Sequence, residues 1–446
     1  MSSTPTSDHG HRPGHARRTL LGTGVGNMLE WYDWNVYATF AVYMSKQLFD
    51  ASNETSALLQ TLAVFAVGFV ARPFGGAFFG WLADRIGRKH SLMVAVICAS
   101  IGSLIIAVCP TYAQAGAWAS LLLLVARLIQ GLAHGGELPS AQTYLSEQAP
   151  RKERGFWSSA IYVTGTLGLL LGLALGKGLE ANLNSAAMAS YGWRIPFFLG
   201  AVLGVFALWI RNRMEESEVF EDAQEHTDVA RENVFVSAAR HWRTGLQVIG
   251  MTMGLTITYY VWSVAMQPYA VKTLKFSQGD GFTASIIGNI VFVLCLPVWG
   301  KISDRIGRKP LMLVAMLGSA IMYIPMLNLI QNQMWQLALA ISVMCILLGA
   351  YLAIAPAVYA ELFPTNVRAT AFGIPYAITI AAFGGTASYV QTWMSDAFPG
   401  NKYAFAIYAI IACCISALTV FTLPETKAKD LHEVDQPLGA GTAAPR

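Results

Sequence analysis

Charged residues are scarce in this sequence. Asp, Glu, Lys and Arg make up 13% of the 446 residues, whereas hydrophobic residues make up 54%. A soluble domain carries roughly 25% charged residues, so the composition excludes a chain with water on all sides. Residues 91–126 and 155–176 contain no charged residue at all, and about 20 consecutive apolar residues span a bilayer as a helix. The sequence therefore predicts an all-α polytopic membrane protein.

Cysteine is also sparse, and no metal-ligand spacing accompanies it. The six cysteines lie inside apolar runs without a CxxC or Cys/His set, so we interpret them as packing residues. We expect no metal and no cofactor. The net charge of +4 is small and gives no reason to expect nucleic acid as a partner. The polar segment before residue 19 has no small-residue cleavage site, which argues against a cleaved signal peptide.

A charged turn occurs twice, once in each half of the chain. The string GWLADRIGRK at residues 80–89 returns as GKISDRIGRK at residues 300–309, each between two apolar runs. Internal repetition of this kind indicates two similar bundles in tandem. In membrane proteins it is typical of transporters that work by alternating access.

Apolar windows predict twelve transmembrane helices in two pseudo-symmetric six-helix bundles. We place the spans at residues 19–44, 58–83, 91–109, 118–146, 156–177, 193–211, 243–271, 282–303, 311–330, 336–360, 371–396 and 403–423. The bundles then cover residues 19–211 and 243–423, with a middle loop at 212–242 and tails at 1–18 and 424–446.

Basic residues predict the orientation of these spans. An even number of spans puts both termini on one side of the membrane. Of the 30 Lys and Arg residues, 22 lie on that side and six on the other. Positive charge is retained on the cytoplasmic side, so both termini are expected in the cytoplasm of a bacterial cell. We also expect the protein to be a monomer embedded in the lipid bilayer.

Five ionisable residues stand out well inside the predicted spans, where charge is costly and points to function. A rise of about 1.5 Å per residue places Asp33 level with Arg127, and Glu30 level with Arg72. We therefore expect the pairs Asp33–Arg127 and Glu30–Arg72. Glu137 lies about 15 Å below Arg127 on the same helix, too far for a direct pair.

The first span has one polar face, made by Asn27, Glu30, Asp33 and Tyr37. Lipid would destabilise this face, so it is expected to line a cavity. One interpretation is a static buried ion pair that only positions helices. The other is substrate or proton handling: protonating a carboxylate frees its arginine, which can then bind a substrate carboxylate with two parallel hydrogen bonds.

Other polar residues in the spans are weaker candidates. His134 is either a pH-sensitive group or a packing residue beside glycines, and Gly131 and Gly135 should allow a close helix contact. Arg194 follows a tryptophan and suits an interfacial anchor or a substrate contact. The candidates for substrate binding are Arg72, Arg127, Tyr37, Asn27, Arg194, Tyr259, Gln267 and Gln391. The candidates for proton coupling are Asp33, Glu30, Glu137 and His134.

The charged turns suggest a gate. Asp84 and Asp304 end their spans on the predicted cytoplasmic face, where each can cap a neighbouring helix and accept hydrogen bonds from arginines. Bonds made only while that side is closed would stabilise one state of the cycle. The candidate gating residues are Asp84, Arg85, Arg88, Asp304, Arg305, Arg308, Glu147, Arg154, Glu361 and Arg368.

Taken together, these strings resemble a known family. The two charged turns resemble the signature of the major facilitator superfamily, and four further strings are similar to its metabolite–proton symporter group. They are GNMLEWYD at residues 26–33, RPFGG at 72–76, RLIQG with GGE at 127–137, and GWRIPF at 192–197. Several also read like the members that carry α-ketoglutarate.

The resemblance implies a proton-coupled importer of a small organic acid rather than an enzyme. It also implies that Arg72 and Arg194 meet substrate carboxylates, and that Asp84 and Arg88 serve the conformational cycle. The alternative within the group is a proton symporter of a zwitterion such as proline or betaine, or of a shikimate-like acid. A membrane enzyme is disfavoured because no nucleophile–base set is present, and a non-transporting receptor because both charged turns are intact.

Overall fold

The computed structural model describes residues 13–86, 88–135, 142, 145–146, 149–212, 242–362 and 368–429. Every regular element within these ranges is helical. In lipid each backbone N–H and C=O must be satisfied inside the protein, and a helix does this within one segment.

Within the described ranges, the first half contains six long helices. They are α1 (Pro13–Leu48), α2 (Glu54–Ile86), α3 (Arg88–Val108), α5 (Ala117–His134), α7 (Arg154–Asn182) and α9 (Ile195–Asn212). Three short elements lie in the connections: α4 (Tyr112–Ala115), α8 (Ser185–Ser190) and the 3₁₀ turn η1 (Gly192–Arg194).

The described residues of the second half also form six helical rods, three of them interrupted. The continuous rods are α14 (Gln278–Ile306), α15 (Lys309–Leu329) and α20 (Ala404–Thr422). The interrupted rods are α12 (Trp242–Tyr259) with η2 (Tyr260–Ala265) and α13 (Met266–Lys272); α16 (Met334–Leu352) with α17 (Ala355–Leu362); and α18 (Arg368–Thr379) with η3 (Ile380–Gly384) and α19 (Gly385–Ala397).

The predicted twelve-span organisation is confirmed over the described ranges. Ten of these helices are long and apolar enough to cross a membrane; α1 is not among them, and it carries the polar face that includes Glu30 and Asp33. Several helices run past the predicted apolar windows, as α7 does to Asn182, because helical hydrogen bonding continues into polar residues beyond the hydrocarbon. The predicted middle loop and both tails fall largely outside the described residues.

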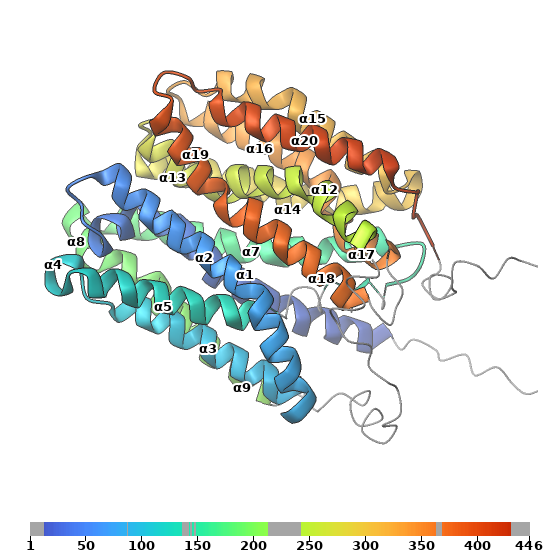
Figure 1. Ribbon diagram of the computed structural model, residues 1–446, viewed down its shortest axis with the longest axis horizontal. Coiled ribbons are helices and arrows are strands. Elements are labelled where there is room, and N and C mark those ends of the chain that lie inside the picture. The colour runs from blue at the N-terminus through green and yellow to red at the C-terminus, as the bar shows by residue number, and fades with distance from the viewer. Residues whose placement is uncertain are drawn as a thin grey trace, which may run out of the picture.

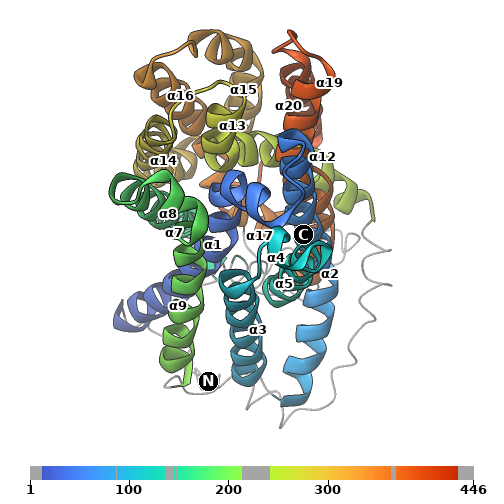
Figure 2. The same cartoon turned by 90° about the vertical axis from the view of Figure 1, so that its left-hand side faces the viewer.

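The helices form two groups, which Figure 2 shows one above the other. In the first, α1 packs on α2 and α7, and α3 packs on α5 and α9; in the second, α12 packs on α18 and α20, and α14 on α16. The two groups meet mainly where α7 packs on α14 and α2 packs on α19. In Figure 1 the start of α1 and the end of α20 lie at one end of the long axis, which we call the terminal end.

Glycines bring α2 and α5 into close contact. A methyl group added to Gly135 would lie 1.9 Å from the Arg72 carbonyl oxygen, and one added to Gly131 would lie 2.1 Å from that of Gly68. The predicted close approach at Gly131 and Gly135 is therefore confirmed. It holds the backbone of Arg72 beside α5, which carries Arg127.

Two π-helical segments lie where the groups meet. The segment η2 contacts α1, and η3 contacts α2. Single π-helical turns occur frequently at functional sites, and interrupted helices mark the binding sites of many transporters. The sequence analysis did not predict these interruptions.

Candidate substrate and proton site

Two arginines from neighbouring helices stack on one tryptophan. The guanidinium carbons of Arg72 and Arg127 lie 4.0 Å and 3.9 Å from the ring centroid of Trp34. Arg127 also lies 4.4 Å from the ring of Tyr37, and Arg72 lies 4.7 Å from that of Phe69. Aromatic faces attract a cation, by about 2 kcal/mol or more when the pair is desolvated, so these rings hold two positive charges inside the first group of helices.

Both guanidiniums retain unused hydrogen-bond donors. Within the described part of the chain, Nε of Arg72 and both Nε and Nη2 of Arg127 have no partner, although Arg127 is fully buried. Buried polar groups are normally hydrogen-bonded. Unfilled guanidinium donors are the groups that a carboxylate ligand would satisfy.

The predicted ion pairs are replaced by a network. Asp33 and Arg127 do not bond directly; the side-chain amide of Gln130 lies between them, donating to Asp33 Oδ2 at 2.8 Å and accepting from Arg127 Nη1 at 2.7 Å. Among the described ion pairs, Glu30 lies against His134, with Oε1 3.7 Å from His134 Nδ1, and none joins it to Arg72. The other ring nitrogen of His134 lies 3.5 Å from Asp33 Oδ2.

The two carboxylates face a cavity inside the first group of helices. It has a volume of about 50 Å³ and is lined from α1, α3, α5 and α9, with Glu30, Asp33 and His134 among the lining residues. The rest of the predicted polar face does not reach this cavity. Asn27 donates to the Ile161 carbonyl on α7, and Tyr37 donates to the Thr61 carbonyl on α2, so both side chains are used in helix contacts.

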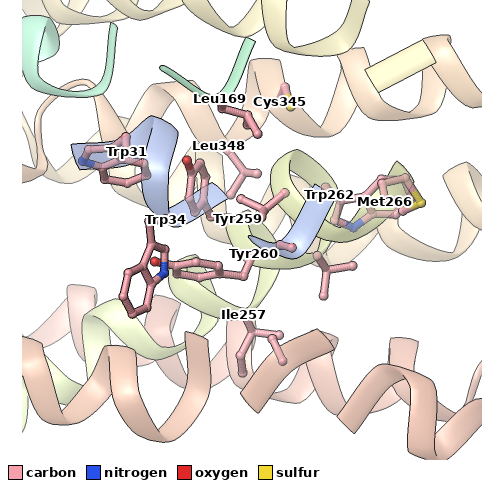
Figure 3. Close-up of a cluster of buried hydrophobic side chains, with 14 of the residues drawn as sticks. Trp31, Trp34, Leu169, Ile257, Tyr259, Tyr260, Trp262, Met266, Cys345 and Leu348 are labelled. Carbon is pink, nitrogen blue, oxygen red and sulfur yellow. The ribbon is translucent and has the colours of Figure 1, made fainter. Parts of the chain in front are cut away.

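Aromatic residues close the space between the two groups of helices. A cavity of about 10 Å³ remains there, lined by Trp31, Tyr162, Tyr259, Tyr260 and Tyr376 among others. The hydroxyls of Tyr162 and Tyr376 lie 3.4 Å apart across the interface. Figure 3 shows Trp31 beside Tyr259, and Trp34 beside Tyr260. The sequence analysis named Tyr259 as a substrate candidate. It did not name Trp31 and Tyr162, because these residues are uncharged and the search relied mainly on charged residues inside the spans.

The other predicted substrate residues are placed elsewhere. Gln267 is buried and donates to Gln278 at 3.0 Å, and Gln391 is buried on α19; neither lines the two cavities. Arg194 donates to the carbonyls of Ala107 and Cys109 and stacks at 4.4 Å on Trp193. These contacts fit the anchoring interpretation of Arg194.

At the terminal end, Glu361 joins both halves of the molecule. It is fully buried and accepts from Arg154 of the first half at 2.8 Å and from Arg308 of the second at 3.3 Å. Thr426 donates to its other oxygen at 2.8 Å. Burial alone would lower the pKa of Arg308, but Glu361 and Asp304 raise it above its usual value, which keeps the guanidinium charged.

Asp304 caps a helix of the opposite half. Its two oxygens accept from the backbone N–H groups of Gly155 and Phe156 at the start of α7, each at 2.9 Å, and Arg308 donates to it at 2.7 Å. The first N–H groups of a helix have no intrahelical partner, so this contact satisfies them. It is the capping contact that the sequence predicted for Asp304.

Of the remaining gating candidates, only Arg85 and Arg305 have described side chains, and neither has a described bond to this network. Arg305 is exposed, and Arg85 is exposed with its guanidinium 4.5 Å from the Trp81 ring. The gating candidate Glu147 and the proton-coupling candidate Glu137 lie outside the described residues. The side chains of Asp84, Arg88 and Arg368 do as well.

We predict that Asp304→Ala opens the terminal end. A hydrogen bond to a charged group contributes about 1.5–3 kcal/mol, and about 1.4 kcal/mol is a tenfold change in an equilibrium. In a cysteine-free background with Ser159→Cys, a buried position on α7, a water-soluble maleimide should react about tenfold faster or more when Asp304 is replaced. The exposed Asp396 on α19 provides the control variant, Asp396→Ala. An unchanged labelling rate would show that this contact does not hold the terminal end shut.

Comparison with known proteins agrees with the architecture. Two bundles with interrupted helices are typical of a secondary transporter, and the matching family and relatives are transporters rather than enzymes. The profile of the family described as "Sugar (and other) transporter" matches residues 20–239 and 218–438. The chain belongs to this family of the major facilitator superfamily, and it is a multi-pass membrane protein.

Individual relatives cover nearly the whole chain. The alpha-ketoglutarate permease of Escherichia coli (strain K12) is 38% identical over 94% of this chain and 97% of its own. The glycine betaine/proline/ectoine/pipecolic acid transporter OusA of Dickeya dadantii is 30% identical over 94% and 85%. The solved structure of the proton:xylose symporter XylE superposes with a TM-score of 0.74 over 95% of this chain and 99% of that one. At 20% identity, this last comparison concerns the fold alone.

Proposed function

We propose that the chain is a proton-coupled symporter importing a small organic acid, such as α-ketoglutarate or another di- or tricarboxylate, across the bacterial inner membrane. Both termini would lie in the cytoplasm, and no cofactor other than the proton gradient would be needed. The observation that carries the proposal is the pair of guanidiniums stacked on Trp34 with unused donors. The name of the 38% identical relative, an alpha-ketoglutarate permease, supports it.

Arg72 is the residue we assign to the substrate. Its aromatic neighbour Phe69 packs on Tyr260 of η2 at 5.3 Å, and a methyl group on Gly385 of α19 would meet the same ring at 2.6 Å. Arg72 therefore lies where the two groups of helices meet. A planar guanidinium binds a carboxylate through two parallel hydrogen bonds, which suits a substrate with one or more carboxylates.

Transport requires the aromatic rings between the groups to separate. The present space of about 10 Å³ is close to the roughly 10–15 Å³ that a single water molecule needs, so a dicarboxylate does not fit there. The described contacts thus correspond to a closed state. Alternating opening of the two ends, with the Glu361 and Asp304 contacts broken when the terminal end opens, would expose Arg72 to each side in turn.

A zwitterionic substrate is the second candidate. The rings of Trp31, Tyr162, Tyr259, Tyr260 and Tyr376 meet in one place, and quaternary ammonium ligands bind in aromatic cages of this kind. The name of the relative OusA includes glycine betaine and proline.

Uptake into proteoliposomes separates these candidates. Purified protein should accumulate labelled α-ketoglutarate when an inward proton gradient is imposed, and unlabelled dicarboxylates should compete while glycine betaine should not. Protein-free liposomes and a proton-conducting ionophore provide the controls. Accumulation of betaine or proline instead would favour the second candidate, and no gradient-dependent accumulation of any organic acid would refute the proposal.

A further inference from the structure

Gln130 is the neutral residue that connects the carboxylates to the arginines. It is fully buried on α5. Its amide nitrogen donates to Asp33 Oδ2 and to Ser103 Oγ, each at 2.8 Å, and its amide oxygen accepts from Arg127 Nη1 at 2.7 Å. The Ser103 hydroxyl donates to the other Asp33 oxygen. Each polar atom of this amide therefore has a partner.

The charge on Asp33 determines which way the amide points. An ionised carboxylate only accepts hydrogen bonds, and a guanidinium only donates them. With Asp33 ionised, the amide must therefore turn its NH₂ toward Asp33 and its oxygen toward Arg127. The reverse orientation would place two acceptors together at Asp33 and two donors together at Arg127.

A proton on Asp33 changes this requirement. The protonated carboxyl has an O–H donor that needs an acceptor, and a reversed amide supplies its oxygen for that purpose. The same reversal presents the NH₂ group to Arg127, which can only donate. Arg127 then loses its bond to Gln130, which is the hydrogen bond described for its guanidinium, and Nη1 joins Nε and Nη2 as a donor that an anion can use.

The neighbours of Asp33 indicate that Gln130 is the residue through which a change in the charge of Asp33 reaches Arg127. Among the described residues, the titratable or charged groups around Asp33 are Glu30 and Tyr32 from α1, and His134 and Arg127 from α5. The described part of α3 contributes the uncharged Ser103, and α9 contributes Gly200, where a methyl group would lie 3.1 Å from Asp33 Oδ1. A proton gained by the cluster of Asp33, Glu30 and His134 can reside on any of its three members, but Gln130 provides the described hydrogen-bonded path from it to Arg127.

We propose that Gln130 is the positioning residue that couples protonation of the Asp33 cluster to the availability of Arg127 for a substrate anion, by reversing its side-chain amide. This inference rests on the proposed function of the site, which it deepens. It assigns coupling to an uncharged side chain that neither carries the proton nor has to touch the substrate.

Two variants test the role of Gln130 in transport. Gln130→Met has a similar length and no hydrogen bonds, and Gln130→Glu can accept from Arg127 but cannot donate to Asp33. Exchange of labelled for unlabelled α-ketoglutarate is measured at acidic and alkaline pH. A coupling between two ligands commonly changes an affinity 5–150-fold, so the wild-type KM should change by about that factor between the two pH values, and by a factor near one in Gln130→Met. In Gln130→Glu two carboxyls share a proton, so the pH midpoint should move upward.

A readout without substrate separates this inference from the proposed function. Because Arg127 stacks on Trp34, the fluorescence of Trp34, taken as the difference from a Trp34→Phe variant, should titrate with pH in the wild type and not in Gln130→Met. The exposed Gln60 provides the control, Gln60→Met, which should behave as wild type in both assays. A Trp34 signal or a KM ratio that changes in Gln130→Met as it does in the wild type overturns the inference. If α-ketoglutarate exchange is absent in the wild type, the proposed function fails while the fluorescence result still decides the role of Gln130.

Discussion

Replacing Arg72 by lysine should raise the KM for α-ketoglutarate uptake about tenfold to a hundredfold, with a smaller effect on the maximal rate. Lysine keeps the positive charge but lacks the planar fork that grips both oxygens of a carboxylate. A charge-assisted hydrogen bond contributes about 1.5–3 kcal/mol, so losing one of two parallel bonds accounts for the size of the effect. Initial rates of exchange, measured at several substrate concentrations, separate KM from the maximal rate.

The matched control for Arg72→Lys is Arg243→Lys. Arg243 also stacks on a tryptophan, at 5.6 Å from Trp242, but it lies exposed at the start of α12. Its replacement should leave KM within about twofold of wild type, as surface changes usually shift free energies by less than about 0.5 kcal/mol. A near-normal KM in Arg72→Lys would mean that the aromatic contacts of Arg72 are structural and that another group binds the anion.

The twelve-helix fold could be read from the sequence because lipid imposes strong and simple rules. A charge-free run such as residues 155–176 has few alternatives to a spanning helix, and the repeated charged turns indicate the two halves. The ends of the helices were less certain, since helical hydrogen bonding extends past the apolar window, as at Asn182. The π-helical segments η2 and η3 were not predicted, because packing against the other bundle rather than local composition decides them.

Depth along a helix could be predicted for the site, but direction around the helix could not. Counting residues placed Asp33 level with Arg127, and one amide does bridge them. The search for charged residues could not identify Gln130, because it is neutral. Asn27 and Tyr37 share the polar face of α1 with Asp33, yet they donate to backbone carbonyls of α7 and α2. A shared face therefore does not imply a shared cavity.

Asp33→Asn should uncouple transport from the proton gradient. Asparagine has the shape of a protonated aspartate and cannot ionise, so the Asp33 cluster loses a carboxylate that can bind and release a proton on each cycle. Exchange of labelled for unlabelled α-ketoglutarate, which moves no net proton, should remain at a substantial fraction of the wild-type rate. Accumulation driven by a pH gradient should fall to the level reached without a gradient. Both assays use the same proteoliposomes, so the ratio of accumulation to exchange does not depend on the amount of reconstituted protein.

The control for Asp33→Asn is Asp280→Asn, which changes an exposed aspartate in the first turn of α14 and should alter neither assay. The contrast with Arg72→Lys is also informative, because that variant should weaken exchange and accumulation together. Unchanged gradient-driven accumulation in Asp33→Asn would exclude Asp33 as the proton carrier and leave Glu30 and His134, its neighbours in the 50 Å³ cavity, as the groups to replace next. Loss of both activities in a correctly folded variant would instead mean that the ionised carboxylate is needed to hold Gln130 and Arg127 in place.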